Sequence, residues 1–278
     1  MTALVLATAC AIVYGSADFC GGLATKRSQV FAVVVLSQAA GLIFIVALLP
    51  LLPGSPSTAA LLWGTLSGVA GGGGLIVFYR ALARGTMSVV APTTAAASAG
   101  VPVIFGLAAG ERPQFLALVG IVVAMAAILL VSREPGTGLS RAALGPLIAA
   151  LVAGVCFGGF FILLSHAPPD GGLWPLVGAR LSSIVLIPLL AMATGQGLRP
   201  GRGTLRVIAL AGVLDMVANV LYLLAVQRGL LSLVAVIVSL YPASTLLLAR
   251  QVLGERLSVV QVIGVGLALG AVALIAAA

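Results

Sequence analysis

Long apolar runs alternate with short breaks of glycine, proline and charged residues along this sequence. Each run is about 20 residues long, the length that a helix needs to cross the hydrocarbon core of a bilayer. The runs are too long for strands and carry few charges, so the pattern predicts transmembrane α-helices. The predicted spans cover residues 3–23, 30–50, 60–79, 88–108, 114–132, 143–164, 173–194, 206–226, 231–250 and 258–277.

The composition agrees with a protein that lies in the lipid bilayer. Hydrophobic residues make up 62% of the 278 positions and charged residues only 7%, whereas a soluble domain carries about 25% charged residues. The net charge of +8 does not indicate a nucleic-acid partner, because the cations are scattered between apolar runs and do not form one basic face. We therefore expect a multi-pass protein of the plasma or inner membrane.

An internal repeat relates positions that are 144 residues apart. Between residues 81 and 131, 14 of 51 positions are identical to the residue 144 places later, where this composition would give about six by chance. The charged matches carry the most weight because charge is scarce here. Arg84-Gly85 recurs as Arg228-Gly229, and Gly110-Glu111-Arg112 recurs as Gly254-Glu255-Arg256.

The repeat divides the ten predicted spans into two halves of five. Because five is odd, the second half must lie upside down relative to the first. Inverted repeats are a recurrent architecture of secondary transporters, in which the two halves exchange conformations and so move the opening of a central cavity across the membrane. A weaker match at a separation of 142 residues pairs Gln38 with Arg180. The fold class predicted is an all-α integral membrane protein of ten helices in two inverted five-helix repeats.

This combination of features resembles the EamA-like family of the drug/metabolite transporter superfamily. Besides the repeated Arg-Gly and Gly-Glu-Arg motifs, the matches are Tyr14-Gly15-Ser16 in the first span, Arg180 in the seventh and Pro242 in the ninth. The chain departs from the family pattern at Gln38, where many members have arginine, and at Ser98, the counterpart of Pro242.

The resemblance implies two EamA-like repeats, residues 1–135 and 140–278, and a secondary transporter of small metabolites or drugs, often an exporter, that works by alternating access. The alternatives are an intramembrane enzyme acting on a lipid-linked substrate, and a passive channel or sensor. Enzyme chemistry needs clustered His, Asp or Glu, or an activated Ser or Cys, and the one histidine, His166, lies in a predicted loop. We expect no enzyme activity, no cofactor and no metal site, in a monomer or homodimer.

The loop charges predict which way the protein crosses the membrane. The loops after odd-numbered spans contain eleven Lys and Arg residues, whereas those after even-numbered spans contain only Arg112 and Arg228. Positively charged loops remain cytoplasmic. Both termini are therefore predicted to lie outside.

Two aspartates, Asp18 and Asp215, fall inside predicted spans. An ionisable group there costs about 2.5–3.5 kcal/mol even on a lenient scale, and such groups usually face a cavity or a partner. Asp215, Asn219 and Tyr222 follow i, i+4, i+7 spacing and share one helix face. Tyr14 precedes Asp18 by four residues in the same way.

Arg180 is the one cation deep within a predicted span, since Arg206 and Arg250 lie at span ends. One interpretation is a polar central cavity that binds substrate or a proton, with Asp215 as the first candidate proton carrier. The other is an Asp–Arg pair or a helix-to-helix hydrogen bond that only stabilises the bundle. The candidate cavity residues are Asp215, Asn219, Tyr222, Asp18, Tyr14, Arg180, Gln38 and Tyr241.

Glycines and two glutamates indicate how the helices pack. Glycines four residues apart allow close helix contact; they occur at Gly64/Gly68/Gly72, Gly106/Gly110, Gly154/Gly158 and Gly266/Gly270. The run Gly71 to Gly74 indicates either a hinge or further packing. Glu111 and Glu255 are expected to stabilise the N-termini of the helices that they precede.

Overall fold

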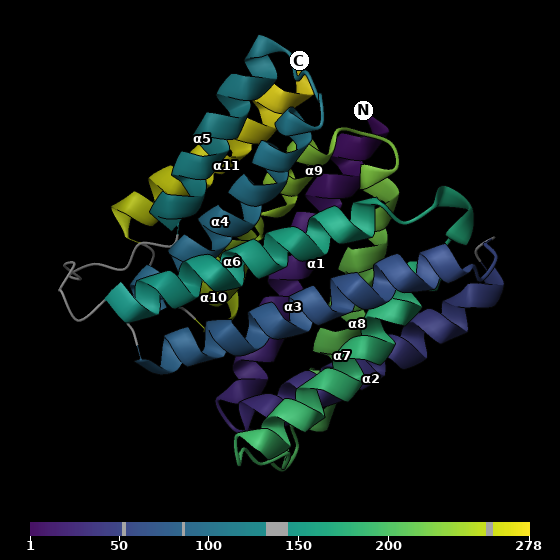
Figure 1. Ribbon diagram of the computed structural model, residues 1–278. Coiled ribbons are helices and arrows are strands. Elements are labelled where there is room, and N and C mark those ends of the chain that lie inside the picture. The colour runs from purple at the N-terminus through teal and green to yellow at the C-terminus, as the bar shows by residue number, and fades with distance from the viewer. Residues whose placement is uncertain (52–53, 85–86, 132–143, 254–257) are drawn as a thin grey trace.

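The computed structural model describes residues 1–51, 54–84, 87–131, 144–253 and 258–278. Within these ranges the protein is entirely helical, and no strand is present. Figure 1 shows a bundle of long helices with both chain ends at the top of the view. The helices are α1 (Thr2–Thr25), α2 (Val30–Leu48), α3 (Thr58–Arg84), α4 (Met87–Ala108), α5 (Phe115–Val131), α6 (Leu144–Ser165), α7 (Trp174–Ala193), α8 (Leu205–Val226), α9 (Leu231–Val238), α10 (Tyr241–Leu253) and α11 (Val259–Ala276).

These helices follow the predicted ranges, and the predicted all-α membrane architecture is confirmed. Among the described residues, seven helical segments are long and apolar enough to cross a membrane, and three shorter apolar helices cover Thr94–Ala108, Phe115–Leu130 and Val259–Ile275. Large apolar side chains such as Ile43, Ile104 and Leu269 are about 70% exposed, as expected where lipid is the solvent. The protein is a multi-pass membrane protein, and the count of ten crossings stays a prediction.

The ninth predicted span differs from the continuous helix that its hydropathy suggested. It is broken at Ser239 and Leu240 into α9 and α10. Pro242 lies in the first turn of α10 and has no N–H to continue the ladder from α9, so the helix restarts there. The break also changes the surroundings: most of α9 is buried, whereas α10 has no buried residue.

Glycines bring α3 against its two neighbours. The helix runs without interruption through Gly71 to Gly74, so the run is not a break in the helix. A Cβ at Gly64 or Gly68 would overlap the backbone of α7, and one at Gly74 would lie 2.9 Å from Cys156 of α6. The expectation of close packing was wrong for Gly266 and Gly270, beside which a Cβ would find no atom within 4 Å.

The most extensive helix contacts join one predicted half to the other. The most extensive pairs are α1 with α8, α3 with α6 and α7, α4 with α6, and α5 with α11. The main apolar core is built from α1, α2, α4 to α9 and α11, with residues such as Ile45, Leu164 and Tyr222 buried in it. Two basic loops also meet, because Ser28 bonds Thr204 at 2.8 Å and the Arg199 N–H donates to Gln29 at 3.0 Å.

Candidate functional site

Arg180 is the centre of a polar network inside the bundle. The residue lies in the first half of α7, and its side chain is only 9% exposed. Its guanidinium donates to the side-chain oxygen of Gln38 on α2 and forms an ion pair with Asp215 on α8. A buried cation without such a partner would cost several kcal/mol, so the three helices are tied together at this point.

The network continues from α8 to α1. The Asn219 amide donates to the Asp215 carbonyl at 2.8 Å and to its carboxylate at 3.3 Å. The Tyr14 hydroxyl donates to the Asn219 side-chain oxygen at 2.9 Å. A chain of hydrogen bonds therefore runs from Tyr14 through Asn219, Asp215 and Arg180 to Gln38. In such a chain each group is held in place by its neighbours, which makes the site pre-organised.

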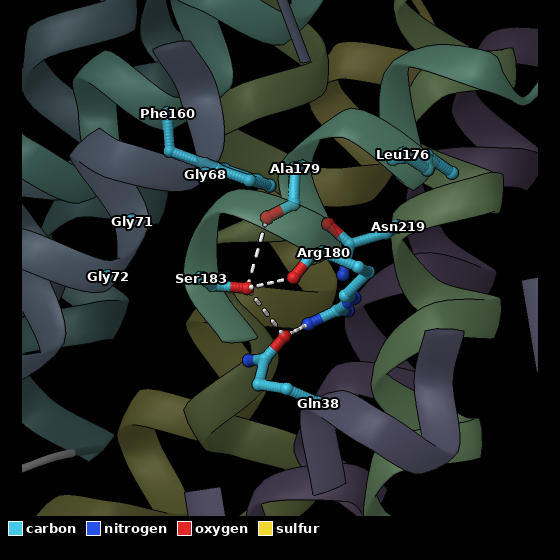
Figure 2. Close-up of a pocket in the computed structure, with 10 residues that line it drawn as sticks. All are labelled: Gln38, Gly68, Gly71, Gly72, Phe160, Leu176, Ala179, Arg180, Ser183 and Asn219. Carbon is cyan, nitrogen blue, oxygen red and sulfur yellow. Dashed lines mark hydrogen bonds between the residues drawn. The ribbon is translucent and has the colours of Figure 1, made fainter. Parts of the chain in front are cut away.

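A small cavity of about 60 Å³ opens beside this network. Figure 2 shows Gln38, Arg180 and Ser183 pointing toward one another, with the Ser183 hydroxyl donating to Gln38 at 3.3 Å. A volume of this size holds only a few water molecules, so a larger substrate requires the helices to move apart. The lining residues are Gln38, Gly68, Gly71, Gly72, Phe160, Leu176, Ala179, Arg180, Ser183 and Asn219.

Five of the eight candidate residues belong to this network; the other three lie apart from it. Tyr222 is fully buried and donates its hydroxyl to the Phe161 carbonyl at 2.8 Å, which places it in the apolar core. The Tyr241 ring lies 6.4 Å from the Tyr14 ring, at the start of α10. Asp18 is exposed, and among the described residues it has neither a hydrogen bond nor an ion pair.

Several lining residues were not predicted from sequence. Ser183 follows Arg180 by three positions and so shares its helix face, a signal that could have found it. Phe160 and Leu176 look like ordinary core residues in the sequence. Only the crossing of α3, α6 and α7 brings them to the cavity, together with Gly68 and its neighbours.

Glu111 stabilises the N-terminus of a different helix from the one that the sequence predicted. It was expected to stabilise its own helix, α5, but its carboxylate instead accepts the backbone N–H groups of Leu231 at 2.6 Å and Ser232 at 3.0 Å. These are the first two residues of α9, whose unpaired N–H groups attract a carboxylate. The repeat counterpart, Gly254-Glu255-Arg256, lies outside the described residues, as does Gly85.

The described residues contain no group of three or more His, Cys, Asp or Glu side chains that could hold a metal ion. His166 packs between the rings of Trp63 and Phe105, with centroids 5.1 Å and 5.6 Å away. The site therefore offers hydrogen bonds and charge to a ligand, supplied by one guanidinium, one carboxylate and three polar side chains.

One comparison with known proteins matches the second half of the chain to a family. Residues 144–277 match the model of the EamA-like transporter family. This segment belongs to the EamA-like transporter family. The match falls within the second predicted repeat, and the resemblance predicted from sequence is confirmed. The family consists of membrane transporters, in agreement with the apolar helices of this chain.

Solved structures share the fold of the whole chain. In all, 29 solved chains match. One of them, a protein of known crystal structure, superposes with a TM-score of 0.79 over 98% of this chain and 95% of its own, at 18% sequence identity. At that identity the likeness shows the fold alone. No curated protein matches this chain.

Proposed function

We propose that this EamA-like protein is a secondary transporter, an exporter of small metabolites or drugs, that works by alternating access. The observation that carries the proposal is the Arg180–Asp215 pair with Gln38, Asn219 and Tyr14 around it. Ionisable groups inside a membrane are costly and usually serve transport. Because these groups come from both predicted halves, a substrate bound among them would contact both.

The contacts between counterpart residues and helices support an architecture of two inverted repeats. Gln38 and Arg180 are repeat counterparts in sequence, and they are hydrogen-bonded to each other. Two counterpart residues of a repeat can contact each other only if they lie next to the symmetry axis that relates the two repeats. A pseudo-two-fold axis would therefore pass between α2 and α7. The same axis would exchange the α1–α8 pair with the α6–α3 pair, and both are among the most extensive contacts in the protein. We assign the repeats to residues 1–135 and 140–278.

One face of the carrier would be closed in this conformation. At the start of α9, Glu111 ties the loop between α4 and α5 to the second half, and α9 itself is buried. At the other end of the same span α10 has no buried residue. This difference between the two ends is the asymmetry that a carrier open to one side needs.

The test is uptake and counterflow in proteoliposomes. Purified protein would be offered pooled labelled amino acids, nucleosides and cationic drugs, with and without an imposed proton gradient. Saturable counterflow that is lost in Arg180→Gln supports a carrier with this site. Flux that does not saturate would indicate a channel, and chemical conversion of a compound would indicate an enzyme; either result contradicts the proposal. Asp170→Asn is the matched control, because Asp170 lies exposed in the loop after α6.

A further inference from the structure

We propose that Asp18, together with the rings of Tyr14 and Tyr241, binds the cationic group of a monovalent organic cation such as a protonated amine. The inference rests on the proposed function and names the substrate class for that carrier. It is carried by three observations: an unpaired carboxylate inside a membrane helix, the position of this carboxylate on the inner face of the helix, and two aromatic rings held close together where α1 meets α10.

The first observation is that Asp18 has no partner while Asp215 has one. Asp215 is ion-paired with Arg180, so these two charges compensate each other. Asp18 lies seven residues before the end of α1 at Thr25, about 10 Å along the helix axis. Among the described residues no cation lies within ion-pair distance of it. The centre of the bundle therefore holds two carboxylates and one guanidinium, which leaves one negative charge uncompensated.

The second observation is where Asp18 sits on α1. It follows Tyr14 by four residues and so lies on the same helix face. This face points toward α8, because the Tyr14 hydroxyl donates a hydrogen bond to Asn219. Gly15, three residues before Asp18, packs against the backbone of Tyr241 and Thr245 at the start of α10. Its carboxylate thus belongs to the inner side of α1, and it is nevertheless exposed.

The third observation is that the aromatic rings are held in place. Ser244 donates to the Ala11 carbonyl at 2.9 Å and Thr245 to the Gly15 carbonyl at 3.1 Å, which fixes the start of α10 against α1. The rings of Tyr14 and Tyr241 are then 6.4 Å apart and inclined by 55°. Aromatic faces beside a carboxylate are the usual means of recognising an ammonium group.

Charge also explains why a cation would be carried. An uncompensated carboxylate is costly within the bilayer, so the site crosses most easily when a cation or a proton neutralises it. The helices packed against α1 carry Arg206, Asp215 and Tyr222 on α8 and Tyr241 and Arg250 on α10, and Asp215 is paired with Arg180; α2 and α9 contain no ionisable group. A proton and an organic cation would therefore compete for Asp18, and cation binding should weaken as the pH falls.

The test uses three probes that share a phenyl group and differ in charge: 2-phenylethylamine, phenylalanine and 3-phenylpropionate. Equilibrium binding would be measured on the purified full-length protein in lipid nanodiscs. We expect the amine to bind more tightly than the zwitterion and the anion. Asp18→Asn should weaken amine binding about tenfold or more and remove its pH dependence, whereas the loop variant Asp170→Asn should leave both unchanged.

A second variant protects the test against a folding defect. Tyr241→Leu removes the ring and keeps an apolar side chain, and it should weaken amine binding about fivefold; Tyr241→Phe keeps the ring and should bind as the wild type does. Preference for the anion, or amine binding that survives Asp18→Asn, overturns the inference. Saturable counterflow of other compounds by a protein that binds no amine overturns it too, while leaving the proposed carrier intact. Amine binding without any counterflow supports the cation site and contradicts the carrier.

Discussion

The Glu111 carboxylate accepts the backbone N–H of Leu231 at 2.6 Å, across 120 positions of sequence. A second bond from the Ser232 N–H to the other carboxylate oxygen measures 3.0 Å. One loop of the first half thus caps a helix of the second half, and the cap lies on the face that we consider closed. Hydrogen bonds to a charged group contribute about 1.5–3 kcal/mol, enough to affect which face of a carrier is open.

We predict that Glu111→Gln opens this face. Cys10 of α1 is fully buried against the Ala218 carbonyl, so it reports on the opening. In a background in which Cys20 and Cys156 are replaced by serine, the labelling of Cys10 by a maleimide should become about tenfold faster, because the loss of about 1.4 kcal/mol shifts an equilibrium by that factor. Arg112→Gln is the control, since it changes an adjacent exposed charge. An unchanged labelling rate would show that the cap does not hold the face closed.

We predict that Arg180 and Asp215 are strongly coupled in stability. Asp215→Asn leaves a guanidinium that is 9% exposed without its counter-ion, whereas the Asp215 side chain is 35% exposed and can be hydrated in Arg180→Gln. Asp215→Asn should therefore destabilise the protein more than Arg180→Gln does. The double variant should be more stable than the sum of the two single destabilisations implies. A double-mutant cycle from thermal unfolding in detergent should give a coupling of about 1–3 kcal/mol. Additive single effects would mean that the ion pair contributes nothing.

Two tyrosines of the candidate set, the half-buried Tyr14 and the buried Tyr222, should behave differently. Tyr14→Phe removes the bond to Asn219 and should alter the apparent affinity for the transported substrate. Tyr222→Phe leaves the Phe161 carbonyl without its donor and should lower stability by about 1 kcal/mol with transport unchanged. Initial uptake rates and melting temperatures of both variants would separate the two roles. The assignment of Tyr222 to the core fails if its variant loses transport at full stability.

Two glycine-to-alanine substitutions in α3 should change the stability of the protein in opposite directions. A Cβ at Gly68 would overlap the Ala179 carbonyl of α7, whereas one at Gly73 would find no atom within 4 Å. Gly73→Ala should therefore stabilise the helix by about 0.5–1 kcal/mol, the usual gain from replacing a helical glycine. Gly68→Ala should lower the melting temperature, because α3 and α7 must separate. Equal effects at the two positions would argue against the packing of these helices.

The orientation of the chain can be tested with epitope tags. The excess of Lys and Arg in the loops after odd-numbered spans predicts that the C-terminus lies outside. A C-terminal tag should be removed by protease added to intact cells, whereas a tag in the loop of residues 195–204 should be protected until the cells are opened. The reverse pattern of protection would show that the topology is inverted and that the C-terminus lies inside.

Much of the architecture could be predicted because apolar length is a local property. Twenty consecutive apolar residues specify a membrane helix whatever its neighbours are, and the helix ranges followed the sequence closely. The repeat at 144 residues was also visible in the sequence, since the scarce charged motifs recur in the same order. The cost of burying charge drew attention to Asp215 and Arg180 before their pairing was known.

The tertiary structure decided which side chains meet. Helix rotation and crossing determine that Arg180 reaches Gln38 and Asp215, that Glu111 caps α9 and not α5, and that Asp18 has no partner among the described residues. These relationships join residues as many as 142 positions apart. The close approach of α2 to α8 beside them requires Gly212, where a Cβ would overlap the Ser37 carbonyl. Hydropathy alone specifies where a helix lies along the chain. The face that the helix turns inward, and the groups it finds there, depend on the packing of all the others.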